Sequence, residues 1–231
     1  MTTALPPFAG FGPDAVAWFE GLERDNSKSY FEATRSQWET QVRDPLMLLL
    51  SELTAEFGGT VRMFRQNRDV RFSPDKSPYK STTYGIIHER PDSAAALYAQ
   101  VSARGLYLGT GYHELARDQL ERFRAAIVSD ETGPTLEAVV REIEAAGLTI
   151  SGEMLKTVPR GYPRDHPRGG LLRYKSFIVG SILPADPVLT SRDAVIEHTV
   201  RAWRTAAPLN QWLDTNVGLS ALSPEERWGR G

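Results

Sequence analysis

A change of hydrophobic period at Gly58-Gly59 restricts how this chain can fold more than any other feature of its sequence. Before the two glycines, apolar residues recur at three- and four-residue spacing, as on a helix with one buried face: Leu46, Leu49, Leu50, Leu53 and Phe57. After them, short segments rich in β-branched and aromatic residues predict strands. The glycines end the helix, because a residue without a Cβ readily takes the left-handed conformation that closes one. The chain therefore needs helices packed on a sheet.

The same patterns predict the elements by residue range. Helices are expected over residues 13–24 and 28–43, and Asp44-Pro45 restarts or kinks the second helix. Strands are expected over 61–64, 82–89, 97–102 and 106–112, and Ala103-Arg104-Gly105 joins the last two in a tight hairpin. The later segments predict, in order, helices over 115–128 and 135–146, a strand over 148–151, a helical turn over 169–174, a strand over 176–183, and two final helices over 191–206 and 208–217.

The chain shows no internal repeat, no low-complexity linker and no break in composition along its 231 residues. We therefore predict a single α+β domain over residues 8–217, with flexible tails at 1–7 and 220–231. Its sheet is expected to be largely antiparallel, with a meander over about residues 60–112 and a further strand over about 176–183. Helices from the N-terminal, central and C-terminal segments pack on this sheet.

The absence of cysteine excludes disulfides, zinc–thiolate sites, iron–sulfur clusters and thiol catalysis. Residues 1–7 have neither a basic nor an apolar segment of the kind that forms a signal peptide. An apolar run such as residues 46–50 is far shorter than the roughly 20 residues that span a bilayer. We expect a cytoplasmic protein with no membrane partner.

Positive charge is concentrated in two segments, although the formal net charge of the chain is −2. Residues 61–80 carry six cationic side chains against Asp69 and Asp75, a local charge of +4: Arg62, Arg65, Arg68, Arg71, Lys76 and Lys80. Residues 156–175 carry six against Asp165, a local charge of +5: Lys156, Arg160, Arg164, Arg168, Arg173 and Lys175. Focused positive charge on stiff, proline-containing backbone is typical of a surface that presents charge to an anionic ligand.

The first basic segment suggests how such a ligand would be held. If residues 69–72 are extended, Val70 and Phe72 face the core while Asp69 and Arg71 share the opposite face. Asp69 then pairs with Arg68 or Arg71 and orients a guanidinium for bidentate contacts. Several cations that converge on one cavity bind phosphate, sulfate or carboxylate, or stabilise developing negative charge.

The candidate site residues follow from the two segments. The expected ligand contacts are Arg65, Arg68, Asp69, Arg71, Lys76, Tyr79, Arg160, Arg173 and Lys175. The candidate catalytic residues are Asp69 and His166, the latter because a histidine beside Asp165 titrates near neutral pH. The competing interpretations are a structural ion pair for Asp69 and an ordinary loop position for His166, which precedes a proline. The sequence assigns no reaction and no cofactor.

No metal site is predicted, because His88, His113 and His198 do not share a ligand spacing. The chain also lacks a phosphate-binding loop of the Walker type, a dinucleotide glycine fingerprint and a nucleophile elbow.

The first basic segment matches a known family signature at eight positions: Arg65, Arg68, Asp69, Arg71, Phe72, Asp75, Lys76 and Tyr79. With Pro159-Arg160-Gly161-Tyr162-Pro163 and Leu171-Leu172-Arg173 in the second segment, the chain resembles an uncharacterised bacterial family, domain of unknown function 2461. One departure falls at Lys28-Ser29-Tyr30-Phe31, where Arg and Trp are expected in relatives. The resemblance covers roughly residues 8–217. It implies a single-domain protein that contains both basic segments, and it implies no substrate, cofactor or catalytic residue.

Three functional hypotheses are consistent with these observations. In the first, the two basic segments line one cleft that binds a small anionic ligand, most plausibly one that carries phosphate. In the second, the chain binds nucleic acid, and Tyr79, Tyr162 and Tyr174 stack on bases among the cations. In the third, the protein is a structural or interaction protein, and the arginines and aspartates of the signature form a network that locks the fold. The oligomeric state is left open.

Overall fold

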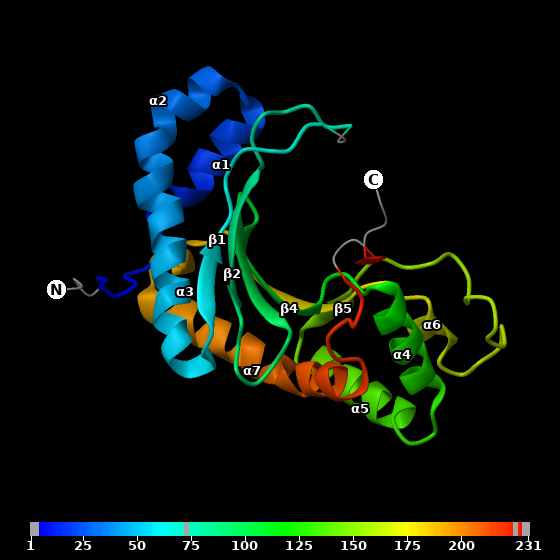
Figure 1. The fold of residues 1–231 in the computed structure, drawn as a ribbon. Coiled ribbons are helices and arrows are strands. Elements are labelled where there is room, and N and C mark those ends of the chain that lie inside the picture. The colour runs from blue at the N-terminus through cyan, green and yellow to red at the C-terminus, as the bar shows by residue number, and fades with distance from the viewer. Residues whose placement is uncertain (1–4, 72–73, 224–225, 228–231) are drawn as a thin grey trace. The chain divides into compact units, whose positions relative to one another are not determined.

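The computed structural model describes residues 5–71, 74–223 and 226–227 (Figure 1). Its elements, in chain order, are α1 (Ala15–Arg24), α2 (Lys28–Trp38), a π-helical turn (Glu39–Arg43), α3 (Asp44–Phe57), β1 (Thr60–Met63), β2 (Thr82–His88), β3 (Ala96–Ser102), β4 (Gly105–Tyr112), α4 (Arg117–Val128), α5 (Gly133–Ala145), β5 (Thr149–Ser151), α6 (Gly169–Leu172), β6 (Phe177–Pro184), a 3-10 turn (Pro187–Thr190) and α7 (Arg192–Asn216).

The strands of the described residues form one six-stranded sheet in the order β1-β2-β3-β4-β6-β5. β1 pairs antiparallel with β2, β2 with β3, and β5 with β6. These pairings confirm the α+β class and the largely antiparallel sheet that the sequence predicts.

The residues group into two compact units. Unit 1 comprises Met1–Pro91, Leu97–Leu108 and Ile182–Arg201, and unit 2 comprises Asp92–Ala96, Gly109–Ser181 and Ala202–Gly231. The first basic segment belongs to unit 1 and the second to unit 2. The expectation of a single domain over residues 8–217 stays a prediction.

In unit 1, the helices before Gly58 form one nearly continuous rod. α2 passes through the π-helical turn directly into α3, whose second residue is Pro45. Proline has no N–H to donate to the carbonyl of Gln41 four residues earlier. That carbonyl accepts a hydrogen bond from the N–H of Gly12 at 3.1 Å, so it is satisfied by a different segment. The predicted restart or kink at Asp44-Pro45 therefore takes the form of a π-helical turn before the proline, and the helix does not stop there.

The β-meander of unit 1 has one buried face and one half-exposed face. β2 alternates strictly between the two, and β3 alternates until Ser102. A Cβ added at Gly85 would lie 2.7 Å from Leu50 Cδ1, so α3 packs against the buried face without intervening atoms. The opposite face carries Tyr84 and Tyr98.

In unit 2, the core forms around Phe123 of α4. Its ring centroid lies 5.3 Å from that of Phe177 in β6 and 6.1 Å from that of Trp212 in α7. The amphipathic helix α5 buries Leu136 and Ile143.

The prediction of two final helices was wrong, because α7 runs unbroken from Arg192 to Asn216 with Pro208 inside it. A proline inside a helix costs about 3 kcal/mol. Leu209, Trp212 and Leu213 follow that proline and are buried, and each contributes about 1.5–3 kcal/mol when removed from water. Packing after the proline therefore outweighs the cost of keeping the helix continuous. Within the described residues, no helix has the length and apolarity that crossing a membrane requires.

Candidate functional site

The first basic segment forms a hairpin between β1 and β2, which we call the basic arm (described residues 64–71 and 74–81). In Figure 1 it leaves the ends of the two strands beside α1. Asn67 pairs with Tyr79 as an isolated antiparallel bridge, and the N–H of Arg68 donates to the carbonyl of Pro78 at 2.9 Å. The arm is therefore a continuation of the sheet rather than an irregular loop.

The extended conformation expected over residues 69–72 is only partly observable. No strand is present over residues 68–71, and the side chain of Val70 is half-buried instead of facing the core. Phe72 and Ser73 lie outside the described residues.

A buried relay of hydrogen bonds anchors the arm where it joins the sheet. Gln66 is 3% exposed. Its amide N–H donates to the carbonyl of Lys80, and its amide oxygen accepts from the hydroxyl of Thr83 at 2.8 Å. The same hydroxyl oxygen accepts from the indole N–H of Trp38 at 2.8 Å. The relay connects both sides of the arm to the C-terminal end of α2.

Asn26 provides a second anchor, at the turn between α1 and α2. Its side chain accepts from the N–H of Tyr79 at 3.0 Å and donates to the carbonyl of Tyr79 at 3.1 Å, as a neighbouring strand would. The ring of Tyr79 is 6% exposed and stacks on Phe31 with centroids 4.2 Å apart. Tyr79, predicted as a ligand contact, therefore lies in the aromatic core of unit 1 and offers almost no surface to a ligand.

The predicted pairing of Asp69 with a neighbouring arginine is present, and the partner is Arg71. The guanidinium Nε donates to Asp69 Oδ1 at 3.0 Å, and Nη2 donates to Oδ2 at 2.7 Å. The Arg71 side-chain hydrogen bonds hold the pKa of the Asp69 carboxyl well below its usual range, and the charge of Arg65 lowers this pKa further. Such a carboxyl stays ionised at neutral pH, so it is a weak base and has no proton to donate. Its chemical role in the arm is to orient Arg71.

Arg68 makes a second connection inside the arm. Its Nη2 lies 3.1 Å from Asp75 Oδ2 and donates weakly to the carbonyl of Tyr79 at 3.4 Å. Its Nε is buried and has no hydrogen-bond partner among the described residues. Asp75 also accepts from the N–H and the hydroxyl of Ser77, which lower the pKa of its carboxyl. Arg68 thus ties the two sides of the arm together.

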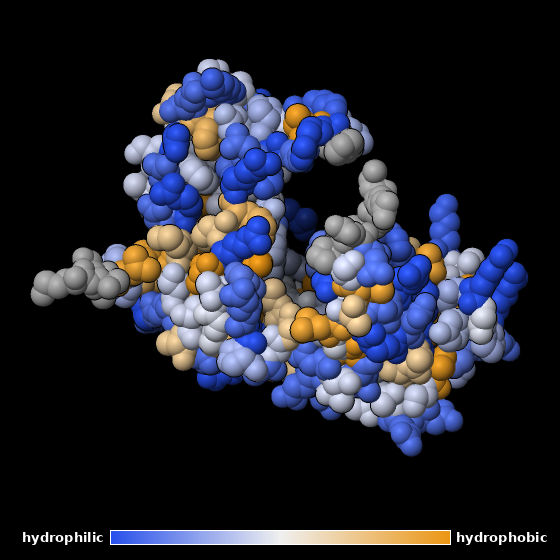
Figure 2. All heavy atoms as spheres, in the orientation of Figure 1, coloured by the Kyte–Doolittle hydropathy of each residue, from blue (hydrophilic) through white to orange (hydrophobic). Residues whose placement is uncertain are grey.

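The remaining cations of the arm lie at its surface. Arg65 is exposed, and nothing in the described part of the chain hydrogen-bonds to its guanidinium or forms an ion pair with it. Arg71 keeps 75% of its side-chain surface exposed while it pairs with Asp69. Lys76 is also exposed and donates to the carbonyl of Val70 at 2.8 Å. Figure 2 shows mostly hydrophilic residues along this arm.

A feature that the sequence reasoning missed lies on the half-exposed face of the sheet beside the arm. Four rings follow one another across it, and we call them the aromatic row: Phe64, Tyr84, Tyr98 and Tyr107. Successive centroids are 4.7, 5.5 and 6.1 Å apart. The Arg62 guanidinium and the Lys80 ammonium lie 5.0 and 4.8 Å from the Phe64 and Tyr84 centroids. Burial alternates along β2 and β3 and puts Tyr84 and Tyr98 on the face away from the core, and the strand register makes them neighbours.

In unit 2, two cations of the second basic segment are engaged by residues just before it. Lys175 pairs with Glu153, and Arg173 Nε donates to the carbonyl of Leu155 at 2.8 Å. Arg160 is exposed. His166 accepts a hydrogen bond at Nδ1 from the N–H of Arg168 at 3.0 Å, so its neutral ring carries the proton on Nε2. This contact makes His166 part of a local turn.

Arg168 is a largely buried cation of this segment, with 10% of its side chain exposed. Its Nε donates to Glu137 Oε2 at 3.1 Å, and its Nη1 donates to the carbonyl of Ile127 at 3.0 Å. It therefore satisfies a carbonyl at the C-terminal end of α4, where helical partners run out. Its role is structural.

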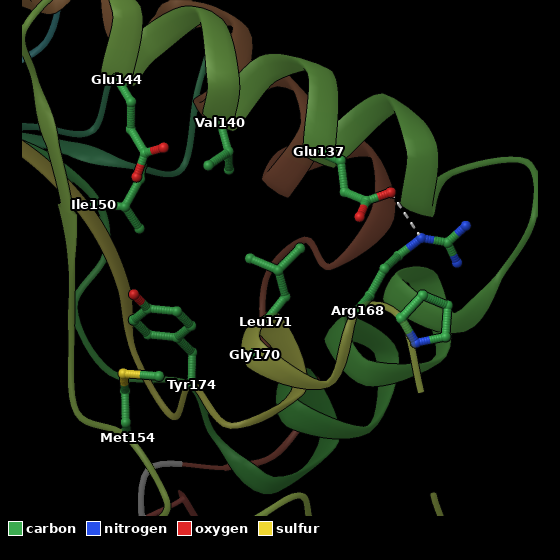
Figure 3. A pocket seen from close by; sticks show the side chains of 10 residues that line it. Glu137, Val140, Glu144, Ile150, Met154, Arg168, Gly170, Leu171 and Tyr174 are labelled. Carbon is green, nitrogen blue, oxygen red and sulfur yellow. Dashed lines mark hydrogen bonds and ion pairs between the residues drawn. The ribbon is translucent and has the colours of Figure 1, made fainter. Parts of the chain in front are cut away.

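A surface pocket of about 290 Å³ lies between α5 and the second basic segment (Figure 3). Its lining is mostly apolar, and both of its carboxylates come from α5: Glu137, Val140, Glu144, Ile150, Met154, Pro167, Arg168, Gly170, Leu171 and Tyr174. Across the described residues, no group of three or more His, Asp or Glu side chains is arranged to hold a metal ion. The predicted cleft lined by both basic segments stays a prediction.

Fold and site together define an α+β protein with a largely antiparallel sheet that extends into a strongly basic hairpin arm. The family model described as "Conserved hypothetical protein (DUF2461)" matches residues 14–212, so the chain belongs to that family, as the signature in the first basic segment indicates. A search of curated proteins found no significant match.

Proposed function

We propose that the basic arm binds a phosphate-bearing anion, with Arg65, Arg71 and Lys76 as its principal contacts. Asp69 is the orienting residue, because its bidentate bond holds the Arg71 guanidinium in one plane. Arg71 stays largely exposed in this pair, and a planar guanidinium has a geometry that suits phosphate oxygens.

The observation that carries this proposal is the exposed guanidinium of Arg65 near the Asp69 carboxylate, which is hydrogen-bonded to Arg71. Two guanidinium groups act on the single carboxylate of Asp69, and only one of them hydrogen-bonds to it. Lys76 adds a third positive charge in the same arm. Positive charge therefore exceeds negative charge locally, and an incoming anion gains contacts without breaking an existing ion pair.

Titration with inorganic pyrophosphate at low ionic strength, followed by calorimetry, tests the proposal. The variant Arg65→Gln/Lys76→Gln is expected to weaken binding by about tenfold or more, because each charge-assisted contact contributes about 1 kcal/mol or more. The matched control Arg24→Gln/Lys28→Gln removes two exposed charges from helices of the same unit and should bind like the unaltered protein. The proposal is contradicted if both variants lose pyrophosphate affinity equally, or if the unaltered protein does not bind pyrophosphate.

The sequence also predicts that Arg160, Arg173 and Lys175 contribute to this site, and this part of the proposal rests on the charge pattern alone. Arg160→Gln in the same titration is its direct test. A shared site requires weaker pyrophosphate binding in this variant, whereas unchanged binding confines the site to the arm.

The aromatic row supports single-stranded nucleic acid as a second candidate ligand. Tyr79 is buried in the aromatic core and unsuitable as a stacking platform, but Tyr84 and Tyr98 are half-exposed and lie beside Arg62 and Lys80. Aromatic side chains interleaved with cations are the usual surface for unpaired bases. An oligonucleotide of about ten nucleotides should then bind with an affinity that falls steeply with salt. Salt-independent binding, or equal binding by Tyr84→Ala, rules this candidate out.

The third hypothesis, a fold-locking Arg/Asp network, has less support in unit 1. Arg68–Asp75 and Asp69–Arg71 both connect residues within the arm. The contacts from the arm to the rest of the unit are made by Gln66 and Tyr79 through Thr83 and Asn26. The two charge pairs therefore hold the arm to itself, while Gln66 and Tyr79 hold it to the rest of the unit.

A further inference from the structure

The pocket on α5 combines an apolar wall with an unneutralised carboxylate (Figure 3). Glu137, Val140 and Glu144 lie at positions i, i+3 and i+7 of α5, so they project from the same face of the helix. Leu171 and Tyr174 point toward that face from the opposite wall. All of these residues belong to unit 2.

The two ends of the pocket differ in charge. At one end, Glu137 is paired with Arg168, whose guanidinium is almost fully buried, so this end is neutral. At the other end, the Glu144 carboxylate accepts no hydrogen bond from, and forms no ion pair with, any described residue. The Tyr174 hydroxyl, which faces Glu144 in Figure 3, likewise has no hydrogen bond within the described part of the chain.

Glu144 and Tyr174 lie at the same end of the pocket and affect each other electrostatically. Partial burial raises the pKa of the Tyr174 phenol, and the negative charge of Glu144 raises it further. Both groups offer oxygen lone pairs to a donor. Neither nearby cation lines the pocket, and Lys175 pairs with Glu153. The charge of Arg173 lowers the pKa of Tyr174, but by less than the charge of Glu144 raises it.

We propose that this pocket binds a small monovalent organic ammonium ion, with its charged nitrogen between Glu144 and Tyr174 and its aliphatic chain along Val140 and Leu171. Charge complementarity selects a cation, because the carboxylates of Glu137 and Glu144 face only Arg168 and leave the lining with one net negative charge. The apolar wall selects an alkyl chain, because burying it removes apolar surface from water. The neutral Glu137–Arg168 end offers nothing to a second ammonium group.

The size of the pocket sets the size of the ligand. About 290 Å³ is the volume of about ten water molecules at roughly 30 Å³ each. A chain of about six carbons with one ammonium nitrogen fits within that limit. Because the site is open to solvent and the ligand is small, we expect a dissociation constant on the order of 1 mM.

Ligand-observed NMR titration of the full-length protein at neutral pH tests the proposal with three probes of equal length: hexylammonium, hexanol and hexanoate. Hexylammonium is expected to bind about tenfold more tightly than hexanol, and hexanoate is expected not to bind, because its carboxylate would face Glu144. Glu144→Gln should weaken hexylammonium binding by about tenfold and leave hexanol unchanged.

Glu142→Gln is the matched control, since Glu142 is exposed on α5 and does not line the pocket. This variant removes the same charge from the same helix, so unchanged hexylammonium binding is expected. Any of three results overturns the proposal. Either hexanol binds as tightly as hexylammonium, or both variants lose hexylammonium affinity equally, or hexylammonium fails to bind at a concentration of about 10 mM, ten times the expected dissociation constant. The site is independent of the basic arm, so pyrophosphate binding at the arm has no bearing on this outcome.

Discussion

Gln66→Ala should destabilise the protein more than any substitution of an arginine or aspartate in the basic arm. Gln66 is buried and links Lys80 to Thr83, whose hydroxyl oxygen in turn accepts from Trp38. The substitution removes two neutral hydrogen bonds worth about 0.5–1.5 kcal/mol each, and it leaves the buried Thr83 O–H without an acceptor at a cost of about 1–3 kcal/mol. Together these terms give a loss of about 2–6 kcal/mol in the free energy of unfolding.

Urea unfolding followed by tryptophan fluorescence measures this loss as a fall in the transition midpoint at constant slope. Gln211→Ala is the control, because Gln211 is exposed on α7 and the same truncation should change stability by less than about 0.5 kcal/mol. Thr83→Val, alone and combined with Gln66→Ala, should show a coupling energy of about 0.5–3 kcal/mol. A loss below about 1 kcal/mol for Gln66→Ala, or additive effects in the double variant, refutes the buried relay as the anchor of the arm. If Arg68→Ala or Asp69→Ala lowers the midpoint further than Gln66→Ala does, the signature is a fold-locking network after all.

Three further predictions concern other parts of the molecule. Burial raises the pKa of the Tyr98 phenol above its usual value of about 10, and the neighbouring tyrosines raise it further. The contribution of Tyr98 to stability is therefore complete below that pH and is lost as pH rises toward the folded-state pKa. Tyr98→Phe should flatten the decline in unfolding free energy between about pH 9 and 11. Glu144→Gln removes a negative charge that raises the pKa of Tyr174, so this pKa should fall toward about 10. An absorbance titration of the phenolate measures the shift, and the same titration of Tyr174→Phe identifies the signal of Tyr174. Gly85→Ala would place a Cβ 2.6 Å from Met63 Sδ and 2.7 Å from Leu50 Cδ1. The overpacking should lower the unfolding free energy by about 1 kcal/mol, whereas an unchanged midpoint would mean that these two side-chain ends move aside.

The secondary structure was predictable wherever local pattern and burial agree. The helical stripe before Gly58 and the alternation after Gly59 correspond to α3 and to the meander of β1 to β4. At Asp44-Pro45 the local effect of proline predicted the change to a π-helical turn only in part, because the helix continues through it. The same rule failed at Pro208, where tertiary packing of Leu209 and Trp212 keeps α7 continuous.

The candidate site was predictable as charge but not as geometry. The local excess of cations in residues 61–80 and 156–175 is a property of the sequence. Which cations stay exposed depends on partners that are distant along the chain, such as Glu137 and the carbonyl of Ile127 for Arg168. Tyr79 illustrates the same limit, since its contacts with Phe31 and Asn26 join residues about fifty positions apart.

By itself, the sequence determined the class of fold, the order of its elements, the family and the two segments in which positive charge is concentrated. Only the tertiary structure decided that Gln66 and Asn26 anchor the arm, that four rings form one row on the sheet, and that a mostly apolar pocket with two glutamates lies beside a basic segment. The physical reason is that periodicity and net charge are sums over neighbours along the chain. Hydrogen bonds, ring contacts and ion pairs act over a few ångströms between residues that only folding brings together.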